Sequence, residues 1–82
     1  MRDKYYSRKF LNKDKGTAMV ETSISHGVEW VDGAAAISDC NRMVRLDFSF
    51  HNPKEKRRSL AKLRLLIDEL VKFEDALKES SV

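Results

Sequence analysis

The sequence predicts a small α+β domain, with an antiparallel sheet of about three strands followed by one long C-terminal helix. Two observations predict this class. Apolar side chains recur at every second position in residues 17–25 and 43–50, which is the period of a half-buried strand. From residue 53 onward the apolar spacing becomes helical, and neither Pro nor Gly follows Pro53.

The sheet is expected to span residues 17–50. Alternation in the two clear strands places a set of apolar residues on one face: Val20, Ile24, Val44, Leu46, Phe48 and Phe50. Residues 28–31 and 34–40 give weaker strand signals. Turns are predicted at His26-Gly27 and Asn41-Arg42. Asp32-Gly33 is either a hairpin turn or a bulge, so residues 34–40 are either a separate strand or the continuation of a bulged one. Connections this short favour an antiparallel meander.

The helix is expected to span residues 53–79. Asn52 suits the N-cap, Pro53 the first helical position, and Glu55 lies three residues after the cap, as in a capping box. A helix of this length extends about 40 Å. Its apolar stripe consists of Leu63, Leu66, Ile67, Leu70, Phe73 and Leu77. We expect Leu63, Leu66, Ile67 and Leu70 of this stripe to pack on the apolar sheet face in one core.

A chain of 82 residues fits one domain, here residues 17–82 preceded by a basic arm, residues 1–16. The arm is a short strand, an extension that lies on a partner, or a frayed terminus. A domain this short has modest stability, and small domains often gain more from association, metal or disulfides. Cys40 is the one cysteine, which excludes an internal disulfide, so association is the expected supplement.

No residue is assigned to catalysis, a metal or a cofactor. Cys40, His26 and His51 are scattered, and no glycine-rich phosphate loop is present. A Cys-His-Asp set would need a base within hydrogen-bond reach, which the spacing does not indicate. No apolar run is long enough for a membrane span, and no secretory signal is recognisable, so a cytoplasmic location is expected.

The first turns of the helix carry an unusual basic cluster. Its members are Lys54, Lys56, Arg57, Arg58, Lys62 and Arg64, against Glu55 alone, which gives a net charge of +5. From residue 68 to 79 the net charge is −3. This order opposes the helix dipole, which favours acidic groups first and basic groups last. The charges are therefore either a solvated face or a contact site.

Two functions would use the basic cluster. The first is protein binding, in which the basic cluster and the arm residues Tyr5 and Tyr6 contact a partner. More specifically, such a protein-binding domain is expected to act as an inhibitor or adaptor of a larger complex. Accessory proteins of phages and mobile elements often have this architecture, a likeness of fold alone. The alternative is phosphate binding to nucleic acid by the arm and helix start, with the tyrosines stacking on bases.

The opposite charges of the two helix halves also predict an antiparallel homodimer. In that arrangement Arg57, Arg58 and Arg64 face Asp68, Glu74 and Asp75 of a second copy. The apolar arc of the helix is wider than one sheet face needs, which assigns Leu60, Val71 and Leu77 to the dimer interface.

Overall fold

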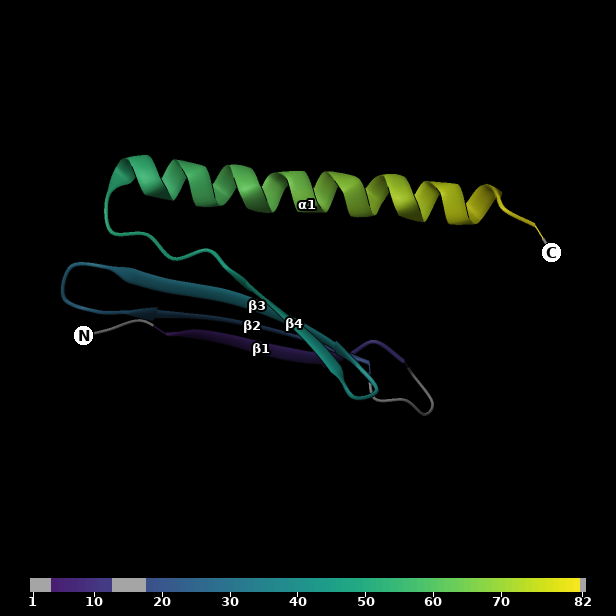
Figure 1. Cartoon of the computed structure of the whole chain (residues 1–82), viewed down its shortest axis with the longest axis horizontal. Helices are drawn as coiled ribbons and strands as arrows, with labels where there is room; N and C mark the ends of the chain where they lie inside the picture. Colours follow the sequence, from purple (N-terminus) through teal and green to yellow (C-terminus); the bar gives the residue numbers. More distant parts are fainter. Residues whose placement is uncertain (1–3, 13–17, 82) are drawn as a thin grey trace.

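The computed structural model describes residues 4–12 and 18–81, so the outer parts of the predicted arm and the start of the first predicted strand, Thr17, lie outside the described residues. Its elements are β1 (Tyr5–Phe10), β2 (Met19–His26), β3 (Val31–Asp39), β4 (Arg42–Asp47) and α1 (Pro53–Glu79). The strands form one antiparallel meander in the order β1-β2-β3-β4, and α1 lies along one side of it (Figure 1). This confirms the predicted fold class. The sheet has four strands because residues 5–10 of the arm pair with β2.

Several predicted strand boundaries differ from the structure. The strand predicted over residues 43–50 ends at Asp47, and Phe50 makes only an isolated bridge with Val31. The prediction of a hairpin turn at Asp32-Gly33 is wrong, because both residues lie inside β3. The turn is at residues 27–30, where the N–H of Gly27 donates to the carbonyl oxygen of Trp30 at 2.8 Å, so residues 28–30 are not a strand. Gly33 pairs with Ile24 of β2, and its carbonyl oxygen accepts a hydrogen bond from the N–H of Phe48 at 2.7 Å, so it is part of the sheet.

The strand register defines two faces of the sheet. Directly opposed residues share a face, as in the row formed by Ser7, Thr22, Ala35 and Leu46. We call this the helix face, because helix residues Leu63 and Leu66 line grooves together with its side chains. The helix face holds Tyr5, Ser7, Lys9, Val20, Thr22, Ile24, Ala35, Ile37, Val44, Leu46 and Phe48. The opposite side, the far face, includes Tyr6, Glu21 and Ala36.

Local capping explains where α1 begins. The side chain of Asn52 accepts a hydrogen bond from the backbone N–H of Glu55, and Pro53 occupies the first turn. The carboxylate of Glu55 in turn accepts from the backbone N–H of His51 at 3.0 Å. The first bond satisfies a donor that the first helical turn leaves without a partner, and the second joins the helix to the residue before the cap. The predicted helix boundaries, residues 53–79, are those of the structure.

The predicted core is only partly closed. Leu46, Phe48, Leu63, Leu66 and Ile67 are half-buried between sheet and helix. Three further predicted core residues are exposed: Ile24 at 39%, Val44 at 59% and Leu70 at 51%. Among the described residues the one buried hydrophobic side chain is Ala36, which lies on the far face. The helix therefore rests on the sheet without enclosing a core.

The overall dimensions show the same openness. The chain exposes 7266 Å², whereas a compact monomer of its mass exposes about 5,000 Å². Its radius of gyration is 15.4 Å, against about 12 Å for a compact domain of this length. Figure 1 shows one cause, since the C-terminal end of α1 extends beyond the sheet.

Candidate interaction surface

A lysine ties the first half of α1 to the β4 side of the sheet. Nζ of Lys62 donates to the carbonyl oxygen of Asp47 at 2.6 Å and lies 5.0 Å from the centre of the Phe48 ring. Further along, Leu66 lines a groove with Val44 and Leu46. This flank of the helix therefore faces β3 and β4, and we call it the β4-side flank.

The other side of the helix face is open. An apolar groove of about 270 Å³, the β1-side groove, lies beside Leu63. Its lining includes Tyr5, Thr22, Ile24, Ala35 and Phe48, and none of its lining residues carries a charge. Tyr5 is 52% exposed and Ile24 39%. Apolar side chains of the sheet are thus left accessible next to the helix.

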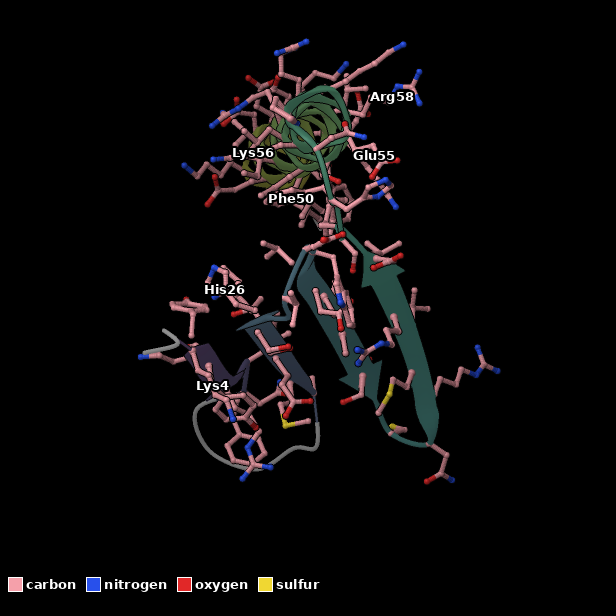
Figure 2. All side chains as sticks on the ribbon, turned by 90° about the vertical axis from the view of Figure 1, so that its left-hand side faces the viewer. Lys4, His26, Phe50, Glu55, Lys56 and Arg58 are labelled. Carbon is pink, nitrogen blue, oxygen red and sulfur yellow. The ribbon has the colours of Figure 1, made fainter. Side chains whose placement is uncertain are left out.

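The helix presents an apolar flank toward this groove. Figure 2 views the molecule end-on and shows Lys56 on the side of β1 and Glu55 on the opposite side. At 100° per residue, Leu60, Ile67 and Val71 follow Lys56 along the same β1-side flank. Leu60 and Val71 are about half exposed. Leu77, the third predicted interface residue, instead continues the sheet-facing stripe and is 58% exposed.

The six residues of the predicted basic cluster do not form one patch. Lys62 donates a hydrogen bond to the carbonyl oxygen of Asp47, at the end of β4. Nζ of Lys56 lies 5.8 Å from the centre of the Phe50 ring, and Arg64 forms an ion pair with Asp68 at 3.4 Å. The other three members, Lys54, Arg57 and Arg58, are exposed and make no ion pair with any described residue. Arg58 points away from the sheet (Figure 2).

The two predicted contact tyrosines lie on opposite faces of β1. Tyr5 lines the β1-side groove, whereas Tyr6 is on the far face, where its hydroxyl donates to the carboxylate of Glu21. That hydrogen bond to Glu21 is the main reason why the pKa of Tyr6 is raised. The structure therefore does not bring the two rings together in one stacking surface.

No family model, curated protein or solved structure matches this chain. Function is therefore inferred from its surfaces alone.

Reactive side chains are dispersed over the described residues. No three of their His, Cys, Asp or Glu side chains come close enough together to hold a metal ion. His26 ends β2 opposite Val31, while Cys40 follows Asp39 at the other end of β3. Nine residues of strand separate them, roughly 25 Å or more at ~3.3 Å per residue. The structure thus holds Cys40 and His26 too far apart to act as a nucleophile and its base.

The helix was also compared with the requirements of a membrane span. Across residues 4–12 and 18–81, no helix combines the length and the apolar character that crossing a bilayer requires.

One surface was missed by the sequence reasoning. A second groove, of about 370 Å³, lies where the 27–30 turn meets the start of α1. Trp30, Phe50, Pro53 and Lys56 contribute to its lining, and Trp30 is 49% exposed. The signal in the sequence is the turn predicted at His26-Gly27, whereas the weak strand pattern of residues 28–31 places Trp30 in a strand. In the structure Gly27 packs against Trp30, because an added Cβ there would overlap the indole.

Proposed function

We propose that this chain is a non-enzymatic protein-binding domain, an inhibitor or adaptor that acts through a surface. The observation that supports this most directly is the uncovered apolar area on the helix face and on α1. Tyr5, Leu60, Leu70 and Phe73 are each more than half exposed. Contiguous apolar patches of this kind mark interaction sites in small proteins. A cytoplasmic accessory role, as in phages and mobile elements, is the setting that we propose.

The three exposed cations of the basic cluster that form no ion pair with a described residue indicate that the partner is acidic. Lys54, Arg57 and Arg58 lie in the first turns of α1, where the dipole is unfavourable for positive charge. They have no acidic partner among the described residues. An acidic protein surface would compensate both the like charges and the dipole. Such complementarity sets the orientation and the rate of association more than the affinity.

Nucleic acid is the second candidate, because phosphates would also compensate these three cations. The structure offers little else to such a ligand. Tyr6 is engaged by Glu21, and Tyr5 lines an uncharged groove on the other face. The two tyrosines therefore do not give these cations a surface on which bases could stack, and we favour a protein partner over nucleic acid.

The test is capture from the native host, with and without nuclease, followed by binding of the purified captured protein. The variant reverses two outward charges, Lys54→Glu with Arg58→Glu. The matched control, Lys72→Glu with Lys78→Glu, changes the net charge equally on the second half of the helix. We expect nuclease-resistant capture that the first variant loses and the control keeps. Capture that nuclease abolishes assigns the cations to nucleic acid, and equal capture by both variants refutes the proposed site.

A further inference from the structure

We propose that the outer edge of β4 binds an extended segment of a partner protein as a fifth strand of the sheet. The segment carries apolar side chains toward the helix face and acidic side chains toward the far face. This inference rests on the proposed function, since it states how the protein partner is recognised. Three observations support it: the free main-chain groups of β4, the groove beside its edge, and the charge of Arg45.

The strand β4 forms one border of the sheet. It pairs with β3 on one side and with no described element on the other. Figure 2 shows β4 as the teal strand at the right-hand border. Five of its six residues are exposed, and the sixth, Leu46, is half-buried. The outer edge of β4 is therefore accessible to another chain.

The main-chain pairing determines which groups of β4 point toward that edge. Val31 and Phe50 exchange two hydrogen bonds, at 2.8 and 3.0 Å, and the N–H of Phe48 donates to the carbonyl oxygen of Gly33 at 2.7 Å. In an antiparallel ladder such pairs alternate with pairs whose N–H and carbonyl groups point away from each other. Continued along the β3–β4 register, the alternation turns outward the main-chain groups of every odd-numbered residue of β4, which are Met43, Arg45 and Asp47.

A contact of Lys62 supports this assignment and limits the length of the free edge. Its Nζ donates to the carbonyl oxygen of Asp47 at 2.6 Å, as expected of a carbonyl that points away from β3. The outward groups of Met43 and Arg45 have no hydrogen-bond partner among residues 4–12 and 18–81. Two donors and two acceptors thus lie in a row, and an extended segment would pair with all of them through its main chain.

A groove beside the edge has room for side chains of the added strand. It has a volume of about 380 Å³ and lies between β3, β4 and Leu66 of α1, with Val44 and Leu46 in its lining. Val44 is 59% exposed. Figure 1 shows α1 and the sheet diverging toward the β3–β4 turn, so the helix leaves the groove open. Directly opposed residues share a face, so an apolar side chain opposite Val44 would lie beside this groove.

On the far face, the edge of β4 is basic. Arg45 lies there, because it is directly opposed to Ala36. Its side chain is exposed and forms no ion pair with any described residue. Asp47, the acidic residue on the same side of β4, already accepts hydrogen bonds from Oγ of Ser49 at 2.6 Å and from its N–H at 3.2 Å. An acidic side chain opposite Arg45 would therefore add a cross-strand pair of opposite charges.

The same charges decide between the available occupants and edges. A second copy of β4 would bring its own Arg42 and Arg45 to this edge, and like charges on facing strands are unfavourable. The other border strand, β1, carries Lys9 on the helix face. A charge on the apolar side of an edge strand protects that edge from pairing. The occupant that fits is an alternating apolar and acidic segment of a different protein, bound at β4.

The first test uses a synthetic heptapeptide of alternating Val and Glu, with blocked ends and a fluorescent label. We expect saturable binding to the full chain by anisotropy, and binding roughly tenfold weaker or more for the matching Val and Lys peptide. N-methylation at alternate positions removes the N–H donors along one side of the peptide only. Methylation along one side should abolish binding, and methylation along the other should leave it. Loss from both sides or from neither overturns the inference, as does an absence of saturable binding.

The second test changes the chain at its edge. Met43→Pro removes an N–H that points away from β3, so the sheet should persist while binding of the Val and Glu peptide falls roughly tenfold or more. Met43→Ala keeps the N–H and is the matched control, and circular dichroism checks the fold of both. Equal binding by the two variants refutes strand addition.

A charge reversal tests the far face while keeping every main-chain group. Arg45→Glu should weaken binding of the Val and Glu peptide on the order of tenfold and strengthen binding of the Val and Lys peptide. A variant that keeps the original preference for the Glu peptide refutes the acidic occupant.

The outcomes also separate this inference from the proposed function. A chain that binds the Val and Glu peptide as expected but captures no protein from the host refutes only the proposed function. A captured protein that binds Met43→Pro as tightly as Met43→Ala refutes only the β4 site. A dimer of the chain that Met43→Pro dissociates, measured by sedimentation, assigns the edge to a second copy and overturns the inference.

Discussion

The backbone N–H of Glu55 donates a hydrogen bond of 2.8 Å to Oδ1 of Asn52. This bond joins the first turn of α1 to the segment that leaves the sheet, so it positions the helix as well as starting it. The side chain of Glu55 reaches back to the N–H of His51, one residue before the cap. The beginning of α1 therefore depends on a few local bonds.

Replacing Asn52 with Ala should lower the free energy of unfolding by about 0.5–2 kcal/mol, because the donor at Glu55 loses its acceptor. Chemical denaturation at one fixed protein concentration measures the change. Asn52→Asp is the control, since its carboxylate also accepts the bond and should leave stability near that of the original chain. An alanine variant as stable as the control would show that the cap contributes nothing.

Leu46→Ala and Leu70→Ala should differ in their dependence on concentration. Leu46 is half-buried under α1, so its truncation should cost about 1–2.5 kcal/mol at any concentration, less than the ~2–5 kcal/mol of a fully buried leucine. Leu70 is 51% exposed, and its truncation should be nearly neutral in dilute protein and destabilising only where the homodimer predicted from the sequence forms. Unfolding curves at two concentrations separate these cases. Equal losses for Leu70→Ala at both would contradict that homodimer.

The helix could be predicted to the residue because its signals are local. Asn52, Pro53 and Glu55 act within one turn, and no later residue competes with them. The strand β1 was harder, since Tyr5–Phe10 places apolar and polar side chains on both faces and gives no period of two. Its pairing depends on β2, which a scan for local patterns does not include.

The closure of the core could not be predicted at all. Periodicity identifies which face of each element is apolar, and Leu66 of the helix and Leu46 of the sheet do line one groove between the layers. Periodicity carries no information on how closely the helix packs on the sheet or on how far the helix extends beyond the sheet. The exposure of Leu70 and Val44 follows from that geometry. The turn at Asp32-Gly33 was wrong for a similar reason, because both residues pair with β2, and local turn signals do not include that pairing.

Gly27→Ala should change the environment of Trp30. An added methyl group would overlap the indole ring, so the ring has to move. Trp30 is the single tryptophan of the chain and is already 49% exposed, so we expect its fluorescence emission to shift to longer wavelength. Val28→Ala, at a side chain that is 96% exposed in the same turn, is the matched control. Emission unchanged in the Gly27 variant would show that the ring does not pack on this turn.

Tyr6 should make stability fall at alkaline pH. Its hydrogen bond to Glu21 raises the pKa of Tyr6 above the ordinary 10.0 in the folded chain. The folded state therefore holds the phenolic proton more tightly, and this contribution is complete below pH 10.0 and is lost as pH rises through the raised pKa. Glu21→Gln removes the carboxylate and should bring the pKa of Tyr6 back toward its ordinary value.

Absorbance titration of tyrosinate measures this pKa. The background variant Tyr5→Phe leaves Tyr6 as the one tyrosine, since the chain has two. If Glu21→Gln leaves the pKa of Tyr6 unchanged, the hydrogen bond to Glu21 is not the cause of the raised pKa.

The scarcity of buried apolar side chains has a consequence for the amount of protein in a cell. Ala36 is the single buried hydrophobic residue among those described, so an isolated copy unfolds readily and exposes its leucines to chaperones and proteases. Copies made in excess of their binding partners would be degraded, while assembled copies survive. We therefore expect the steady-state level of this chain to follow the supply of its partners rather than its own rate of synthesis.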